Sequence, residues 1–224
     1  LVLFAPLLLF AYTPGRVDHH GVQVLIAGFG LLSLVHIARG ENGDVFAFFS
    51  ALAFACGFWI GTEILPWAII FLFCLAVAAA LYKEKTAKNA AVFGVYLAFF
   101  TAAFIPIALP AAEYSSLALS WFSPAYALFA VLSGLVFVAG WGAGYALNNK
   151  LLRLLLYASL SAAGAAAFFA FVPDAWHGPF ADYHSFNATI ALNNIVEAQP
   201  LARAFHLNRF TPGFLAFCRL LFFS

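Results

Sequence analysis

ILPWAIIFLFCLAVAAALY, residues 64–82, is a run without a charged side chain. About 20 consecutive apolar residues are needed for a helix to cross the hydrocarbon core of a bilayer, so the run predicts a transmembrane helix. The rest of the chain has the same character, because 65% of all residues are hydrophobic and only 8% are charged. About a quarter of the residues in a soluble domain are charged. The composition therefore indicates an integral membrane protein with several spanning helices.

Five further runs are long and apolar enough to span, at residues 21–38, 45–62, 90–112, 122–147 and 151–172. The first and last apolar segments, 1–12 and 210–224, are too short to span. Because the chain also contains no Met, we expect it to be part of a longer protein. The predicted fold is all-α, a polytopic transmembrane helical bundle with six full spans and two partial ones. We expect residues 1–224 to form one transmembrane domain.

The connections between these runs alternate in charge. Basic connections contain Arg39, the group 83–88, and the pair Lys150 and Arg153. Acidic connections contain Asp18, Glu63, Glu113 and a long loop at residues 173–209. By the positive-inside rule the basic connections face the cytoplasm, so we expect a multi-pass protein of the plasma (inner) membrane. Six crossings separate Asp18 from Glu197, which places both on the extracytoplasmic side.

Two polar clusters on that side carry groups that bind metal ions. Asp18 and His20 are two residues apart, so their side chains point the same way in an extended or turning segment. A carboxylate with an imidazole suits Mn²⁺ or Zn²⁺, whereas Mg²⁺ prefers mostly oxygen ligands. The alternative is a helix-capping Asp18 followed by two interfacial histidines. Glu197 belongs to the second cluster, residues 193–201, where the alternative is a solvated loop carboxylate.

Both clusters resemble motifs of one enzyme family. The run Gly15-Arg16-Val17-Asp18-His19-His20 resembles the second acidic motif of the oligosaccharyltransferase catalytic subunit, which in archaeal members contains Asp-His-His. The run Ile195-Val196-Glu197-Ala198-Gln199-Pro200 resembles the Ser-Val-Ser-Glu-His-Gln-Pro motif of that family's fifth external loop. The order of the motifs, their shared side and the six predicted helices between them also match, from about the third helix of such a protein into the tenth.

The resemblance implies a GT-C-like fold and a metal-dependent, inverting membrane glycosyltransferase. Such an enzyme moves a sugar or oligosaccharide from a polyprenyl-(pyro)phosphate donor to a protein or glycan acceptor. Asp18 and His20 would bind the divalent metal, Mn²⁺ or Mg²⁺ with Zn²⁺ as the alternative. Glu197 would approach the metal and contact the acceptor, so Asp18 and Glu197 are the implied catalytic residues. The metal would stabilise charge on the leaving phosphate as a Lewis acid.

Substrate-binding residues are expected in the same two regions. Arg16, Arg203 and Arg209 suit the oxygens of a pyrophosphate, since the guanidinium fork matches phosphate geometry; contact with lipid headgroups is the alternative. His19 and Gln199 belong to the motifs and are expected at the substrate. Three features depart from the family. Ala198 replaces the motif's His, and neither the first acidic motif nor the soluble domain with Trp-Trp-Asp-Tyr-Gly occurs in these residues. The acceptor therefore stays open.

Three other functions are alternatives to this one. A transporter would need charged residues or broken helices near the bilayer midplane, whereas nearly all charges here fall in connections. A haem-binding subunit would need histidines facing each other inside the bundle. A structural subunit of a larger membrane complex remains an alternative. Membrane lipid is an expected partner, and the net charge of +1 gives no argument for nucleic acid.

Overall fold

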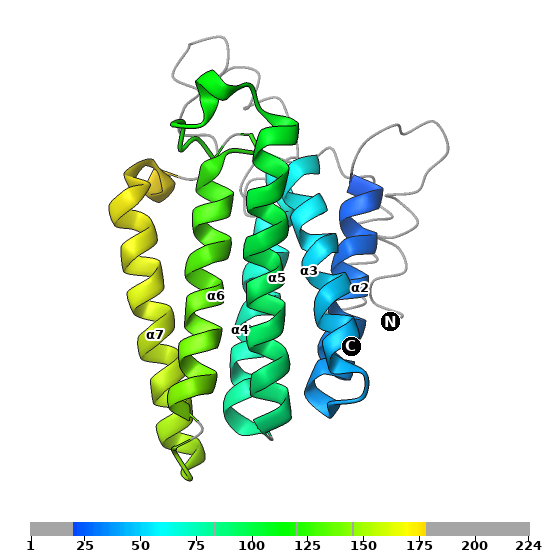
Figure 1. Ribbon diagram of the computed structural model, residues 1–224, viewed down its shortest axis with the longest axis vertical. Coiled ribbons are helices and arrows are strands. Elements are labelled where there is room, and N and C mark those ends of the chain that lie inside the picture. The colour runs from blue at the N-terminus through cyan, green and yellow to red at the C-terminus, as the bar shows by residue number, and fades with distance from the viewer. Residues whose placement is uncertain (1–19, 83, 120, 145, 178–224) are drawn as a thin grey trace, which may run out of the picture. The chain divides into compact units, whose positions relative to one another are not determined.

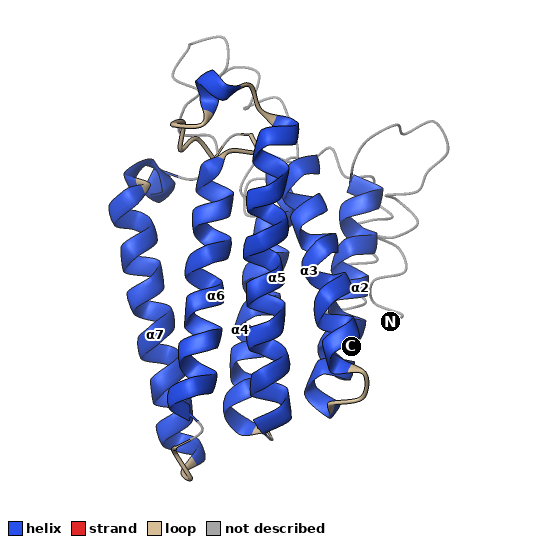
Figure 2. Ribbon diagram, viewed as in Figure 1, coloured by secondary structure: helices blue, strands red, loops and turns tan. Residues whose placement is uncertain are grey.

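The structure is a computed structural model that describes residues 20–82, 84–119, 121–144 and 146–177. All of these residues belong to one compact unit, Leu1–Asp182. The described part is helical and contains no strand (Figure 2). Its long helices are α2 (His20–Arg39), α3 (Gly43–Ile60), α4 (Leu65–Leu81), α5 (Glu84–Ala108), α6 (Pro124–Gly144) and α7 (Lys150–Phe171). Three short 3₁₀ helices join or follow them: η2 (Thr62–Ile64), η3 (Ala111–Glu113) and η4 (Pro173–His177).

Six of these helices are long and apolar enough to cross a membrane, as the hydropathy pattern predicts. Their outward faces remain apolar, since Phe73, Phe99 and Ile107 are each more than 60% exposed. An exposed apolar surface of this extent is unfavourable in water but favourable against lipid tails. The described bundle is therefore that of a multi-pass membrane protein.

Successive helices run antiparallel, and α5 lies in the middle of the bundle (Figure 1). It packs most extensively against α6 and α3, and it also contacts α2 and α4. Rings from three helices meet beside it: the ring centroid of Phe71 on α4 lies 4.9 Å from that of Phe54 on α3 and 5.0 Å from that of Phe93 on α5. By contrast, Tyr157 is the only fully buried residue in α7, so α7 lies at the periphery.

The α5–α6 contact is close because two glycines face each other. A Cβ built on Gly134 would lie 2.9 Å from the Gly94 carbonyl oxygen, and one built on Gly94 would lie 2.8 Å from the Gly134 Cα. Gly140 has a similar relation to the Tyr157 ring of α7, while Gly142 has open space around it. Small residues allow membrane helices to approach closely, and Gly134 and Gly140 of α6 have this role.

One predicted boundary is wrong. The charged segment 83–89 was expected to be a loop, but α5 begins at Glu84. The helix continues beyond the apolar run because its first turns are held by tertiary contacts. Thr86 is 1% exposed and its Oγ1 donates to the Ala38 carbonyl at 3.0 Å, and Asn89 is 4% exposed. The other spans begin and end within four residues of their predicted limits.

The glycine contact predicts a difference between two identical substitutions in α6. Gly134→Ala should push the backbones of α5 and α6 apart and lower the free energy of unfolding by about 1–3 kcal/mol, the usual range for overpacking a tight contact. Gly142→Ala adds the same methyl group in open space and should change stability by less than about 0.5 kcal/mol. Thermal unfolding of the two variants in the same detergent measures the difference, and equal melting temperatures would contradict the contact.

Candidate functional site

The described residues include only the edges of the predicted catalytic clusters. His20 is the first residue of α2, and nothing is described of its side chain. The other seven predicted site residues lie outside the described residues: Arg16, Asp18, His19, Glu197, Gln199, Arg203 and Arg209. The candidate site is therefore built from the helix ends that lead into both clusters.

These helix ends lie at one end of the bundle. The start of α2, the turn η2, the turn η3 and the end of α7 with η4 all lie at the upper end in Figure 1. We call this the acidic end, because its charged side chains among the described residues are Glu63, Glu113 and Asp174, with no Lys or Arg. The opposite, basic end carries Arg39, Lys85, Lys88, Lys150 and Arg153 together with Glu41, Asp44 and Glu84. The described helices thus agree with the predicted even number of crossings.

At the acidic end a carboxylate reaches the beginning of α2. Gln23 Nε2 donates a hydrogen bond to Glu63 Oε2 at 3.1 Å, across 40 residues of sequence. Gln23 is 4% exposed, whereas Glu63 is exposed. This hydrogen bond lies about one helical turn after His20, where the positive end of the α2 dipole favours a negatively charged group such as the Glu63 carboxylate. Glu63, which the sequence placed only in an acidic connection, therefore lies beside the start of α2.

The connection into α6 is fixed at the same end by two hydroxyl groups. Tyr126 is fully buried, and its Oη donates to the Leu119 carbonyl at 2.8 Å. Ser123 Oγ donates to the Ala118 carbonyl and accepts from the Ala125 backbone N–H. These bonds satisfy backbone groups that a buried connection would otherwise leave unpaired. They also fix Leu119 against the outer ends of the helices.

An apolar groove of about 460 Å³ runs between α4, α6 and α7. Its floor is formed by side chains between residues 65 and 76 of α4 and between 129 and 137 of α6, and α7 contributes residues between 161 and 169. Leu119 and Ala175 border it at the acidic end. Among the described residues that line it, Ser133 and Ser161 carry the only polar side chains. Eleven helical steps along α4 correspond to roughly 16 Å, so the groove extends from the acidic end to about the middle of the bundle.

Among the residues that the structure describes, no three His, Cys, Asp or Glu side chains gather closely enough to hold a metal ion. The predicted ligands Asp18 and Glu197 lie outside the described residues, and the His20 side chain is not described. In the same part of the chain, no charged side chain lies further than five residues from a helix end. The interior of the described bundle is therefore without charge.

Comparison of this chain with models of protein families, with curated proteins and with solved structures finds no match.

Two features of the site were missed by sequence reasoning. Gln23 carries no signal of its own, because a single amide in an apolar helix is compatible with many environments. The groove is formed by three helices that are distant in sequence, and hydropathy alone does not show which faces leave a gap. The helical spacing of Ser161, Gly164 and Ala165 on α7 was the available signal, since small residues at i, i+3 and i+4 share one face.

The placement of the helix ends predicts a labelling pattern. In a variant without native cysteines, Glu113→Cys and Asp174→Cys should react with a membrane-impermeant maleimide from the same side. Asn42→Cys and Asn148→Cys should react only from the other side, because an odd number of helices separates them from the first pair. Labelling of intact and permeabilised cells provides the measurement. Reaction of positions 42 and 174 from one side would contradict the arrangement.

Proposed function

We propose that this protein is a membrane glycosyltransferase that transfers a sugar or oligosaccharide from a polyprenyl-(pyro)phosphate donor. The acceptor is a protein or glycan on the extracytoplasmic face, which corresponds here to the acidic end. The proposal takes its chemistry from the resemblance of the two polar clusters to oligosaccharyltransferase motifs. The observation that carries it further is that the helix ends leading into both clusters lie at one end of the bundle (Figure 1).

The apolar groove supports the choice of a lipid-linked donor. It begins at the acidic end and is lined almost wholly by apolar side chains. A polyprenyl chain lying in it would keep its hydrocarbon among Leu72, Phe129 and Phe168 while its phosphate remained at the bundle end. Small ligand sites of this kind combine an apolar wall with a few polar groups that fix orientation. A donor that is half lipid and half sugar requires that combination.

The polar residues take the roles that the resemblance implies. Asp18, His20 and Glu197 would hold a divalent cation, and a carboxylate–imidazole–carboxylate set is a suitable ligand set for such an ion. When bound, the ion supplies electrostatic stabilisation of the departing phosphate. Arg16, Arg203 and Arg209 would bind the pyrophosphate oxygens. Glu197 would also orient the acceptor, so that the protein acts mainly by placement and electrostatics. The hydrogen bond from Gln23 to Glu63 would stabilise the start of α2 behind this site.

Separate substitutions of the two proposed catalytic carboxylates test the function. Asp18→Ala and Glu197→Gln should each lower the transfer of sugar from a polyprenyl-linked donor by at least a hundredfold, because each removes a charge from the reacting centre. Asp174→Asn removes a carboxylate from η4 at the same end and should leave the rate within about twofold. Transfer is measured with the purified full chain and a fluorescent lipid-linked donor.

Helical content and thermal stability of the three variants should be equal, so that a loss of activity reports on chemistry. Full transfer by Asp18→Ala or Glu197→Gln would overturn the assigned roles. Equal losses of transfer activity in all three variants would show that any carboxylate at this end affects the rate. That result would also contradict the specific roles of Asp18 and Glu197.

The groove gives an independent test with neighbouring alanines of α7. Ala165 lines the groove, whereas Ala166 does not, and both are exposed. Ala165→Phe should narrow the groove and raise the KM for a long-chain donor about tenfold, while kcat changes little because the reacting groups are distant. Ala166→Phe should leave KM unchanged. A donor with a short prenyl chain should not distinguish the two variants, and equal KM values with the long-chain donor would contradict binding in the groove.

A further inference from the structure

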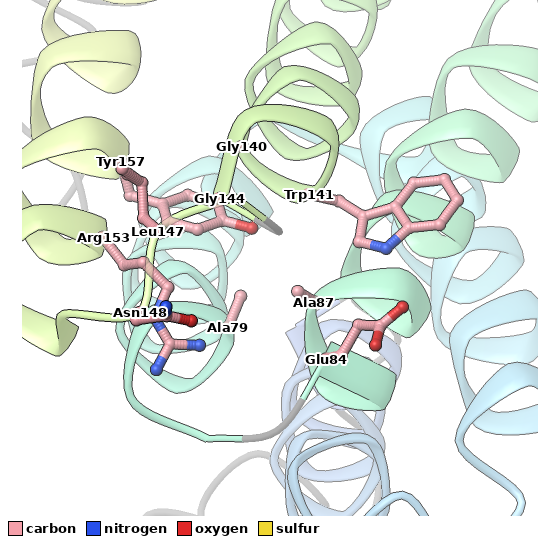
Figure 3. A pocket seen from close by; sticks show the side chains of 10 residues that line it. All are labelled: Ala79, Glu84, Ala87, Gly140, Trp141, Gly144, Leu147, Asn148, Arg153 and Tyr157. Atoms are coloured by element: carbon pink, nitrogen blue, oxygen red, sulfur yellow. The ribbon is translucent and has the colours of Figure 1, made fainter.

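A second cavity lies at the basic end of the bundle, remote from the proposed transferase site (Figure 3). Its volume is about 190 Å³, far more than the roughly 10–15 Å³ that one water molecule requires. It lies where α4 ends, α5 begins, α6 ends and α7 begins. Its polar lining includes Glu84, Trp141, Asn148 and Arg153. This lining differs from the apolar groove in that polar groups make up much of its wall.

The two charged side chains stand on different walls. Arg153 and Asn148 lie on one side of the cavity, and Glu84 lies on the other side with the Trp141 ring (Figure 3). Within the described part of the chain, no ion pair joins Arg153 to Glu84. The Arg153 Nη1 donates to the Tyr82 carbonyl at 3.3 Å, which holds the guanidinium at the cavity. Its Nε is buried without a hydrogen-bond partner among the described residues, as is the Tyr157 hydroxyl.

Opposite charges on separate walls favour a ligand that carries both charges. A simple anion would gain Arg153 but would have to tolerate the Glu84 carboxylate. A simple cation would gain Glu84 but would have to tolerate the guanidinium. A ligand that carries both a phosphate and a primary ammonium group would satisfy both, since guanidinium donors suit phosphate oxygens and an ammonium donates hydrogen bonds to a carboxylate. Two helix N-termini, those of α5 and α7, add positive potential near the cavity.

The location favours a lipid as the source of that group. The cavity lies at the ends of helices long and apolar enough to span a membrane, which is the depth of phospholipid headgroups. The exposed neighbours Leu151, Leu152 and Leu155 on α7 provide an apolar surface for acyl chains next to it. We therefore propose that this cavity binds the headgroup of an amino-phospholipid of the phosphatidylethanolamine type. Arg153 and Asn148 bind the phosphate, and Glu84 binds the primary ammonium.

Lipid retention tests this site in the full chain. The detergent-purified protein is incubated with vesicles of equal parts phosphatidylethanolamine, phosphatidylcholine and phosphatidylglycerol, and the lipid that remains bound is quantified by native mass spectrometry. Phosphatidylethanolamine should be retained at least fivefold over the other two. Phosphatidylcholine cannot donate a hydrogen bond to Glu84, and phosphatidylglycerol has no ammonium group. Added O-phosphoethanolamine at the same concentration should not displace the retained lipid.

Three variants locate the binding. Glu84→Gln should abolish the preference for phosphatidylethanolamine over phosphatidylglycerol, and Arg153→Gln should lower retention of both at least fivefold. Lys88→Gln, an exposed change on α5 that does not line the cavity, should have no effect. Because Arg153 also contacts Tyr82, the Glu84 variant keeps the test valid if the Arg153 variant is unstable. No preference in the unaltered protein, equal effects of the Glu84 and Lys88 variants, or displacement by O-phosphoethanolamine would overturn the proposal.

Discussion

Gly94 and Gly134 bring the backbones of α5 and α6 into contact, and the position of α6 relative to the helices around α5 depends on this contact. In lipid there is little hydrophobic gain when two helices meet, because the tails are as apolar as the side chains. Close packing of small residues therefore has to supply the attraction. Since α5 also packs against α2, α3 and α4, the position of α6 relative to this group is set by two residues without side chains. A single methyl group at Gly134 would increase the distance between the α5 and α6 backbones.

The remaining packing of α6 explains both cavities. Gly140 accommodates the Tyr157 ring, so α7 approaches α6 closely near the basic end. Toward the acidic end α7 presents Ser161, Gly164 and Ala165 to the space between α4 and α6. These small side chains do not fill that space, and the apolar groove results. The polar cavity at the other end arises where α6 and α7 are joined and Arg153 lies beside the end of α4. Each cavity is therefore a consequence of which residue sizes face α6.

The spans were predictable from sequence, and their ends were less so. Hydropathy marks only the part of a helix that lies in hydrocarbon. For the run at 64–82 this part is almost the whole helix, since α4 spans Leu65–Leu81. At residues 83–89 hydropathy failed to predict helix, because Glu84, Lys85 and Lys88 are polar but belong to α5. The hydrogen bond from Thr86 to the Ala38 carbonyl and the burial of Asn89 make that extension favourable. The parity of the crossings was predictable from charge alone, whereas the pairing of Gln23 with Glu63 depends on how α2 packs beside η2 and carries no sequence signal.

The distribution of charge bears on the choice between transfer and transport. In the described helices, charged side chains occur only near the two ends. A polar solute that crossed the apolar middle of the bundle would lose its hydrating water, and no charged protein group would replace that water. This loss is costly for any charged or hydrogen-bonding group. A lipid-linked sugar does not face that cost, since its hydrocarbon can occupy the groove while its polar head stays at the acidic end. The uncharged interior of the described helices and the one-sided groove therefore suit the lipid-linked donor that we propose, because such a donor would remain within one leaflet.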